Sequence, residues 1–510
     1  FKNKKMNKAI YIATSEQNSG KSIITLGLMS MLMGKMAKVG YFRPIIEDIE
    51  EGGFDNHIET VIGHFGMDIE FEDAYAITKS KLIKKKNKGK IGEVLDLIIE
   101  KYKKLEERFD FVLVEGTGFT GEGTVIELDM NVLIAKNLGI PTIIVGSGAG
   151  KTLEELIDSL YLLYDSFKVK DVEVLAVIAN KVQLQNIELV TNSLKKSLPQ
   201  NILVNSIPLI QNLNNPTVQE IVNELDAKVL FGAAHLNNQT GSFSVGAMQL
   251  RNYLLHLKEN SLVITPGDRA DIILGALQAN ESLNYPTISG IVLTGNIVPE
   301  DSILKLIEGL STIVPIIAVE EGTYFITNKI GSIKSKIYAN NKQKIKISIA
   351  TFEKYVDLDN LAEKLITFEA EGMTPKMFQY NLVKRAREHR KHIVLPEGND
   401  ERIIRAVSRL LEMDVVAISV IGNKKQIESK VLELGLFFDF SKVQIINPIE
   451  SEHFDDYVNT YYELRKAKNV TIEMAKDLME DVSYFGTMMV YKGHADGMVS
   501  GAAHTTQHTI

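Results

Sequence analysis

The stretch AIYIATSEQNSGKSIITLGLMSMLMG, residues 9–34, decides the fold class of the first part of the chain. Its first six residues are mostly apolar and predict a buried β-strand, while the apolar run from Ile23 predicts a helix. Between them lies SEQNSGKS, in the strand–loop–helix order of a phosphate-binding loop. The amides of such a loop and the amino end of its helix point towards an anion. This segment therefore predicts an α/β fold with an anion site after its first strand.

Lys21 and Ser22 are the residue types that phosphate chemistry needs in this loop. The lysine, which follows Gly20, would reach phosphate oxygens, and the serine hydroxyl would be a ligand of Mg²⁺. The full pattern GxxxxGK[ST] requires glycine at position 15, where this chain has Ser15. Two interpretations therefore stay open: an anion or nucleotide site, or a loop that has kept its fold and lost its ligand.

Three polar residues near the ends of other apolar strands fit the nucleotide interpretation. Glu115 would be an acidic partner of magnesium, Arg43 a second phosphate cation, and Asn180 a contact to the base. The alternative for each is that strand ends carry polar residues because they leave the core. The SGKS loop, the Arg–Pro pair and the VEG strand resemble the dethiobiotin-synthetase-like P-loop fold. That resemblance implies binding of ATP and Mg²⁺.

In the rest of the chain, predicted strands and helices continue to alternate, and they divide into further blocks. Short apolar strands alternate with helical periods over residues 8–226, which predicts a parallel sheet covered by helices. Residues 227–340 contain smaller strands and predict a second, compact α/β domain. Residues 341–373 are predicted to be a linker that consists of a lysine-rich loop followed by a helical stretch. A third α/β domain is predicted over residues 374–510.

The composition excludes several classes of protein. At about 100–200 residues per domain, 510 residues allow three domains or four. With 45% hydrophobic and 24% charged residues, the chain is globular and not disordered. A net charge of −8 gives no basic field for nucleic acid, and no apolar stretch approaches the roughly 18 residues of a membrane span. The absence of cysteine excludes disulfides and thiolate catalysis, and it fits a cytoplasmic location.

The second block contains two motifs, TPGDRADI and GIVLTGNIVP. The proline–glycine pair predicts a turn, Asp268 a cap for the helix that follows, and Gly295 with Asn296 a turn of positive φ. The functional alternative is a ligand loop that contains Asp268, Arg269 and Thr294. The two motifs resemble the DRTGG domain, with Asn296 in place of its last glycine. The resemblance implies a regulatory or structural role.

Three stretches of the third block resemble the phosphate acetyltransferase family: residues 374–407, YYELRKAKNVT at 461–471 and YFGTMMVYKGHADGMVSGAAHTT at 484–506. With the P-loop and DRTGG blocks before them, the resemblance covers essentially the whole chain and is to the long, three-domain form of the family. It implies reversible acetyl transfer between CoA and phosphate, with acetyl-CoA and phosphate as substrates and no cofactor for the transfer itself. It also implies a homo-oligomer.

Substrates of such high negative charge need fixed cations and backbone donors where charge develops. Arg465 matches a family arginine implicated in binding substrate phosphate, and its alternative is a surface arginine on a helix. In the stretch ADGMVSGAAHTT, small residues allow close approach of the backbone to an anion, and hydroxyls supply donors. The substrate-lining candidates of this loop are Ser500, Gly501, His504, Thr505 and Thr506.

The family's catalytic aspartate, serine and later arginines have no matching positions before Ile510. The sequence therefore predicts truncation within the acyltransferase domain and an inactive fragment. No metal site is expected, because His504 and His508 have no acidic residue between them and the family needs no catalytic metal. The alternative functions are an ATP-dependent, ligase-like P-loop enzyme and a non-catalytic regulatory module. The acyl-chain preference, the effector of the first two domains and the oligomer size are not predicted.

Overall fold

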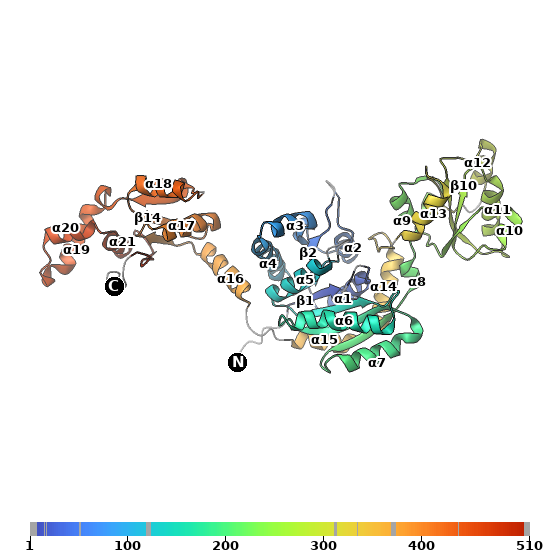
Figure 1. Ribbon diagram of the computed structural model, residues 1–510, viewed down its shortest axis with the longest axis horizontal. Helices are drawn as coiled ribbons and strands as arrows, with labels where there is room; N and C mark the ends of the chain where they lie inside the picture. Colours follow the sequence, from blue (N-terminus) through green and yellow to red (C-terminus); the bar gives the residue numbers. More distant parts are fainter. Residues whose placement is uncertain are drawn as a thin grey trace. The chain divides into compact units, whose positions relative to one another are not determined.

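The computed structural model describes residues 8–14, 16, 18–49, 53–118, 124–310, 314–333, 335–368, 374–436 and 438–503, with 124–129 as backbone only. The chain divides into two compact units, one ending at Thr374 and the other beginning at Pro375. The first unit holds two sheets and the second unit holds one (Figure 1). Among the described helices, none combines the length and apolarity needed to cross a bilayer.

A seven-stranded sheet of order β3-β2-β4-β1-β5-β6-β7 forms the core of the P-loop domain. Every pairing is parallel, and most of its strands are buried along their whole length, as predicted for a parallel α/β fold. The strands are β1 (Ala9–Thr14), β2 (Val39–Ile46), β3 (Tyr75–Thr78), β4 (Phe111–Glu115), β5 (Thr142–Ser147), β6 (Val174–Val182) and β7 (Leu203–Pro208).

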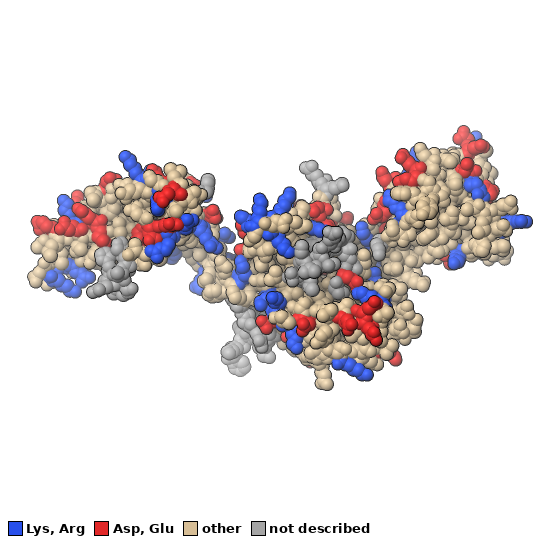
Figure 2. All heavy atoms as spheres, viewed as in Figure 1, with Lys and Arg blue, Asp and Glu red and all other residues tan. Residues whose placement is uncertain are grey.

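Helices connect these strands, and the first of them follows the SGKS loop directly. The helices are α1 (Lys21–Met33), α2 (Asn56–Phe65), α3 (Lys79–Asn87), α4 (Ile91–Arg108), α5 (Thr124–Leu138), α6 (Leu153–Lys168), α7 (Ile187–Ser197) and α8 (Gln211–Asn214). Figure 2 shows basic side chains gathered over α3, whose last turn contains Lys84, Lys85 and Lys86.

The segment 341–373 contains the helical stretch expected for it, but the part expected to be a lysine-rich loop is helical as well. It forms two helices, α14 (Lys342–Tyr355) and α15 (Leu358–Thr367), within the first unit. Helix α14 packs on α1, where the fully buried Phe352 ring lies so close to Gly27 that an added Cβ would be 2.1 Å from it. Helix α14 is amphipathic: one of its faces is buried, and most of its lysines lie on the opposite, exposed face.

The second domain is built on a five-stranded sheet of order β8-β12-β11-β10-β9, in which only β8 runs antiparallel to its neighbour. Its strands are β8 (Lys228–Phe231), β9 (Ser242–Val245), β10 (Ser261–Pro266), β11 (Ile288–Thr294) and β12 (Ile316–Ala318). Its helices are α9 (Val218–Leu225), α10 (Leu250–Leu254), α11 (Ala270–Glu281), α12 (Asp301–Glu308) and α13 (Thr323–Ser332). Helix α9 precedes the boundary predicted at residue 227, yet its apolar residues pack in the core of this second sheet.

The second unit contains a four-stranded parallel sheet of order β15-β14-β13-β16. Its strands are β13 (His392–Leu395), β14 (Ala417–Ile421), β15 (Val443–Ile446) and β16 (Gly497–Met498). Its helices are α16 (Pro375–Glu388), α17 (Glu401–Met413), α18 (Lys424–Glu433), α19 (Phe454–Arg465), α20 (Ile472–Met479) and α21 (Val482–Tyr491). Two hydrophobic cores pack against this sheet, which agrees with the predicted α/β class.

Candidate functional site

The loop between β1 and α1 is shaped by Gly20 and Asn180. Gly20 is the N-cap of α1 with φ 80°, a left-handed conformation that favours glycine. The Asn180 amide nitrogen donates to the carbonyl of Ser19 at 2.8 Å, and its oxygen accepts from the Lys181 amide at 2.9 Å. The side chain of Asn180 therefore fixes the loop, and its predicted contact to a base stays a prediction. Ser15, the departure from the loop pattern, lies outside the described residues.

Lys21 is the first residue of α1, and its side chain points towards the end of β4. Its Nζ donates to the carbonyl of Gly116 at 2.8 Å and lies 3.7 Å from a carboxylate oxygen of Glu115. Burial lowers the pKa of Lys21 to about 8, against the opposing effect of Glu115. The predicted phosphate cation is therefore already in contact with a protein carboxylate.

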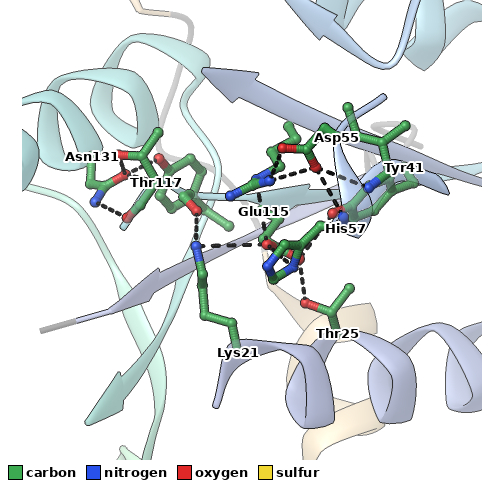
Figure 3. Close-up of polar contacts among 12 residues, drawn as sticks. Lys21, Thr25, Tyr41, Asp55, His57, Glu115, Thr117 and Asn131 are labelled. Carbon is green, nitrogen blue, oxygen red and sulfur yellow. Dashed lines mark hydrogen bonds and ion pairs between the residues drawn. The ribbon is translucent and has the colours of Figure 1, made fainter. Parts of the chain in front are cut away.

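Glu115 lies at the centre of a buried cluster of polar side chains (Figure 3). Its Oε2 accepts hydrogen bonds from Thr25 Oγ1 at 2.7 Å and from the Tyr41 hydroxyl at 2.9 Å. Its Oε1 lies 3.1 Å from His57 Nδ1, 3.6 Å from Arg43 Nε and 3.7 Å from Lys21 Nζ. Burial alone would raise the pKa of Glu115, but His57, Lys21 and Arg43 hold it well below its usual range.

Glu115 was predicted as a partner of Mg²⁺, and this role stays a prediction. Its Oε2 already accepts two hydrogen bonds, whereas its Oε1 is buried with no hydrogen-bond partner among the described residues and faces the cations of Lys21 and Arg43. Within the described part of the chain, no group of three or more His, Asp or Glu side chains has the geometry of a metal site. The oxygen ligand that the loop itself offers is the Ser22 hydroxyl, which lies beside the cleft described below.

Arg43, predicted as a second phosphate cation, is buried and paired inside the protein. Its Nη1 donates to Asp55 at 2.5 Å, and Asp55 in turn accepts the amides of His57 and Ile58 as the N-cap of α2. Burial would lower the pKa of Arg43, but Asp55, Glu115 and Tyr41 raise it. Arg43 thus joins β2, β4 and the start of α2, although it also borders the cleft.

A cleft of about 750 Å³ opens in front of the loop, which is within the usual size of small-molecule sites. Residues 18–23 form one side, and the backbone amides at the start of α1 lie there. Pro208, Leu209, Ile210 and Leu213 supply an apolar part. Another side comes from residues 329, 332, 333 and 335–337, at the end of the second domain. The loop, Lys21, Ser22 and Arg43 therefore come together at one cleft, as the sequence predicted.

In the second domain, the two motif loops lie side by side, because β10 and β11 are parallel neighbours. Thr294 donates to or accepts from Thr323 at 2.7 Å, and the Arg269 guanidinium donates to Met248 O at 2.8 Å and to Asp271 at 2.9 and 3.0 Å. Both side chains thus hold loops of the domain itself. Asp268 was predicted to cap α11, but the N-cap is Arg269, without a side-chain cap.

The predicted turn of positive φ in the second motif is confirmed. Gly295 has φ 83° and Asn296 has φ 55°, so the two successive residues both adopt the left-handed region. The turn follows β11 and lies against the first motif, where an added Cβ on Gly267 would be 1.7 Å from the Ile297 carbonyl.

In the third domain, the loop after β16 is held by a residue that sequence analysis missed. The carboxylate of Glu397 accepts three successive amides, from Gly501 at 3.0 Å, Ala502 at 2.8 Å and Ala503 at 2.6 Å. Glu397 is 5% exposed and follows β13, in the sequence LPEG. The signal that could have found it is a glutamate two residues after an apolar strand, close to the pattern that drew attention to Glu115 at the end of β4.

Of the predicted substrate-lining residues, the structure describes two in this loop. Gly501 has φ 106°, and the Ser500 hydroxyl oxygen is buried with no hydrogen-bond partner among the described residues. His504, Thr505 and Thr506 lie outside the described residues. Arg465 is the exposed last residue of α19, and it lowers the pKa of the neighbouring Tyr461, which burial raises.

Comparisons with known proteins assign each domain to a family. Residues 377–510 match the family described as phosphate acetyl/butaryl transferase, residues 8–217 match an AAA domain and residues 220–333 match the DRTGG domain. A phosphate acetyltransferase of Nitratidesulfovibrio vulgaris is 40% identical over 510 residues, covering 99% of this chain and 72% of the relative. A phosphate acetyltransferase of Synechocystis is 39% identical over 516 residues, covering 99% and 73%.

Among solved structures, a phosphotransacetylase from Streptococcus pyogenes is 38% identical over 27% of this chain and 41% of its own, with a TM-score of 0.25. These sequence matches cover 99% of this chain and 72–73% of the length of the two relatives, and the truncation of the third domain stays a prediction.

Proposed function

The chain belongs to the phosphate acetyltransferase family, and from this premise we propose which of its residues serve the reaction. The reaction transfers an acetyl group reversibly between acetyl-CoA and phosphate, giving acetyl phosphate and CoA. The observation that carries this function is the 40% identity to a named phosphate acetyltransferase over 510 residues, together with the family match of the third domain. Acyl transfer therefore takes precedence over a ligase-like P-loop activity.

For the acyl-transfer site we propose Ser500, Gly501, His504, Thr505, Thr506 and Arg465. The loop after β16 is supported by the buried Ser500 hydroxyl, which has no partner among the described residues and can donate to a ligand oxygen. Gly501 supports it as well, because its φ of 106° lets the backbone turn there without steric strain. Arg465 is exposed and would supply a planar cation for substrate phosphate.

The test of this site is the kinetics of Arg465→Ala. Loss of a charge-assisted contact to phosphate should raise KM for phosphate or acetyl phosphate by about tenfold or more, and KM for CoA much less. The control is Arg405→Ala, which removes an equally exposed arginine from α17. Unchanged kinetics of Arg465→Ala would remove this residue from the site.

For the first domain we propose a nucleotide site at residues 18–22, with ATP as the ligand. The left-handed Gly20, the start of α1 and the Ser22 hydroxyl beside the cleft support it. Lys21, Arg43, Glu115 and Asn180 then act mainly by holding the loop and its surroundings. Calorimetric titration with ATP and ADP tests the site: wild type should give binding heat, and Lys21→Ala should weaken it. Absence of heat with wild type would exclude the site.

We also propose that the first two domains regulate or support the acyltransferase domain, in keeping with the DRTGG match. A homo-oligomer and a cytoplasmic location remain part of this proposal, because the family resemblance and the lack of cysteine suggested them. Light scattering of the purified protein tests the first of these.

A further inference from the structure

The cleft in front of the P-loop has a second wall that no P-loop supplies. Residues 329, 332, 333 and 335–337 come from the end of α13 and the segment after it, and they line the cleft together with residues 18–23. This second wall brings two lysines, Lys329 and Lys336, and two hydroxyls, Ser332 and Ser335. The two lysines donate hydrogen bonds to anions, and so does the hydroxyl of Ser335, whereas the Ser332 hydroxyl already donates to the carbonyl of Lys329 at 2.8 Å.

The second wall is fastened to the P-loop domain on one side. The carbonyl of Ile337 accepts from Asn56 Nδ2 at 2.9 Å and from Thr60 Oγ1 at 3.1 Å. Both donors are in α2, the helix whose first turn is held by Asp55 and Arg43. The wall is therefore tied to the same buried cluster that positions Lys21.

On its other side the wall is fastened through a buried ion pair. Lys344 of α14 is fully buried and donates to Glu220 at 2.7 Å and to the Ser335 hydroxyl at 2.6 Å. Glu220, in α9, also accepts the backbone amide of Lys336 at 2.7 Å. Helices from both ends of the second domain's sequence thus hold residues 335–336 in place beside the cleft.

The cations on the P-loop side of the cleft and those on the second wall differ in how far the protein compensates their charges. Lys21 and Arg43 are buried against Glu115 and Asp55, so their charges are largely compensated within the protein. Lys336 is 55% exposed on its side chain, and its ion pair is with the half-exposed Glu224 at 3.8 Å, which is a weak surface contact. Lys329 has its Nζ 5.9 Å from the Phe325 ring. Lys181 also borders the cleft, as do the acidic Glu47 and Glu224.

We propose that the cleft-lining residues 329, 332, 333 and 335–337 are the second half of the nucleotide site, and that its ligand is a nucleoside polyphosphate whose outer phosphates contact Lys329 and Lys336. The proposal rests on the P-loop nucleotide site proposed above and deepens it. The loop amides would take the inner phosphates, and the apolar residues 208–210 would face the base. Because the ligand would touch both domains, its binding would couple them.

The test compares ATP and AMP binding by calorimetry in three proteins: wild type, the double variant Lys329→Ala/Lys336→Ala, and a control, Lys81→Ala/Lys84→Ala. The control removes two exposed lysines of α3 that do not line the cleft, so the change in net charge is the same. The double variant should bind ATP about tenfold more weakly than the control, with a much smaller change for AMP. A second readout is hydrogen exchange, since ATP should slow exchange of the backbone amides of residues 335–337 in wild type and not in the double variant.

The outcomes separate this inference from the proposal beneath it. If wild type gives no heat with ATP, the P-loop site itself is wrong, and the second wall falls with it. If wild type and control bind ATP and the Lys329/Lys336 double variant binds it equally well, the P-loop site stands and the second wall is wrong. An equal loss for ATP and AMP would also overturn it, because it would show no preference for the outer phosphates.

Discussion

Two loops of this protein follow parallel strands, and each lies beside a buried glutamate. The two glutamates differ in their partners, which are side chains in one case and backbone amides in the other. Glu115, at the end of β4, is surrounded by the side chains of Lys21, Arg43 and His57 and two hydroxyls. Glu397, after β13, accepts three successive backbone amides of its own neighbouring loop.

This difference in partners determines which groups of each loop, backbone amides or side chains, can contact a ligand. Around Glu115 the side-chain cations are compensated, and the amides at the start of α1 still face a cleft. Around Glu397 the amides of residues 501–503 are occupied by a protein carboxylate, so a ligand at this loop would depend on side chains such as Ser500. The first loop is thus suited to bind through backbone and the second through side chains.

The largest loss of stability is expected from Glu115→Gln. This change keeps the shape of the side chain but leaves Lys21 and Arg43 buried without their shared carboxylate, at a cost of about 3–5 kcal/mol in the free energy of unfolding of the first unit. Urea denaturation followed by circular dichroism measures it. Glu154→Gln, at an exposed position in α6, is the control and should stay within about 0.5 kcal/mol. A loss below 1 kcal/mol would contradict the charge compensation described here.

A smaller loss of stability is expected from Glu397→Ala, because its carboxylate accepts hydrogen bonds from neutral backbone amides that lie in a loop near the protein surface. Three charge-assisted hydrogen bonds disappear, but water can reach the amides of residues 501–503, so we expect a loss of about 2–3 kcal/mol. Hydrogen exchange of these amides reports the change locally and should accelerate. Glu401→Ala removes an exposed ion pair of α17 and should leave their exchange unchanged. Unchanged exchange in Glu397→Ala would mean that the loop holds its shape by other contacts.

The sequence predicted the strand–loop–helix unit at residues 9–34 and the α/β class of all three domains, because apolar runs and glycines report local structure directly. It could not show that Lys21, Arg43 and Asn180 are engaged by the protein itself, since their partners lie between 12 and 161 positions away. The same reason explains the prediction of a loop where α14 forms. Phe352 of α14 packs against Gly27, and no local pattern reveals such a distant contact.

A third prediction concerns pH and the charge of Lys21. With a pKa of about 8 in the folded protein, the side chain is charged at pH 7 and mostly neutral at pH 9. If the charge attracts a nucleotide, ATP affinity should fall by up to about tenfold between these values. Lys21→Arg keeps its charge at both, so its affinity should not change. Calorimetry at pH 7 and pH 9, at equal ionic strength, measures both proteins, and the same decline in Lys21→Arg would exclude Lys21 as the titrating group.

The smallest expected effect is a difference in stability between alanine substitutions at Gly20 and at Gly501, one glycine from each loop. Gly20 and Gly501 both have positive φ, 80° and 106°, so alanine is strained at either position by about 1 kcal/mol. At Gly20 an added Cβ would also lie 2.1 Å from Asn180 Nδ2 and would break its hydrogen bond to the loop, whereas at Gly501 no described residue lies within 4 Å of an added Cβ. Gly20→Ala should therefore destabilise its unit by about 1 kcal/mol more than Gly501→Ala, measured by thermal unfolding. Gly20→Ala in an Asn180→Ala background removes the clash and should recover most of that difference; no recovery would show that the strain lies in the backbone alone.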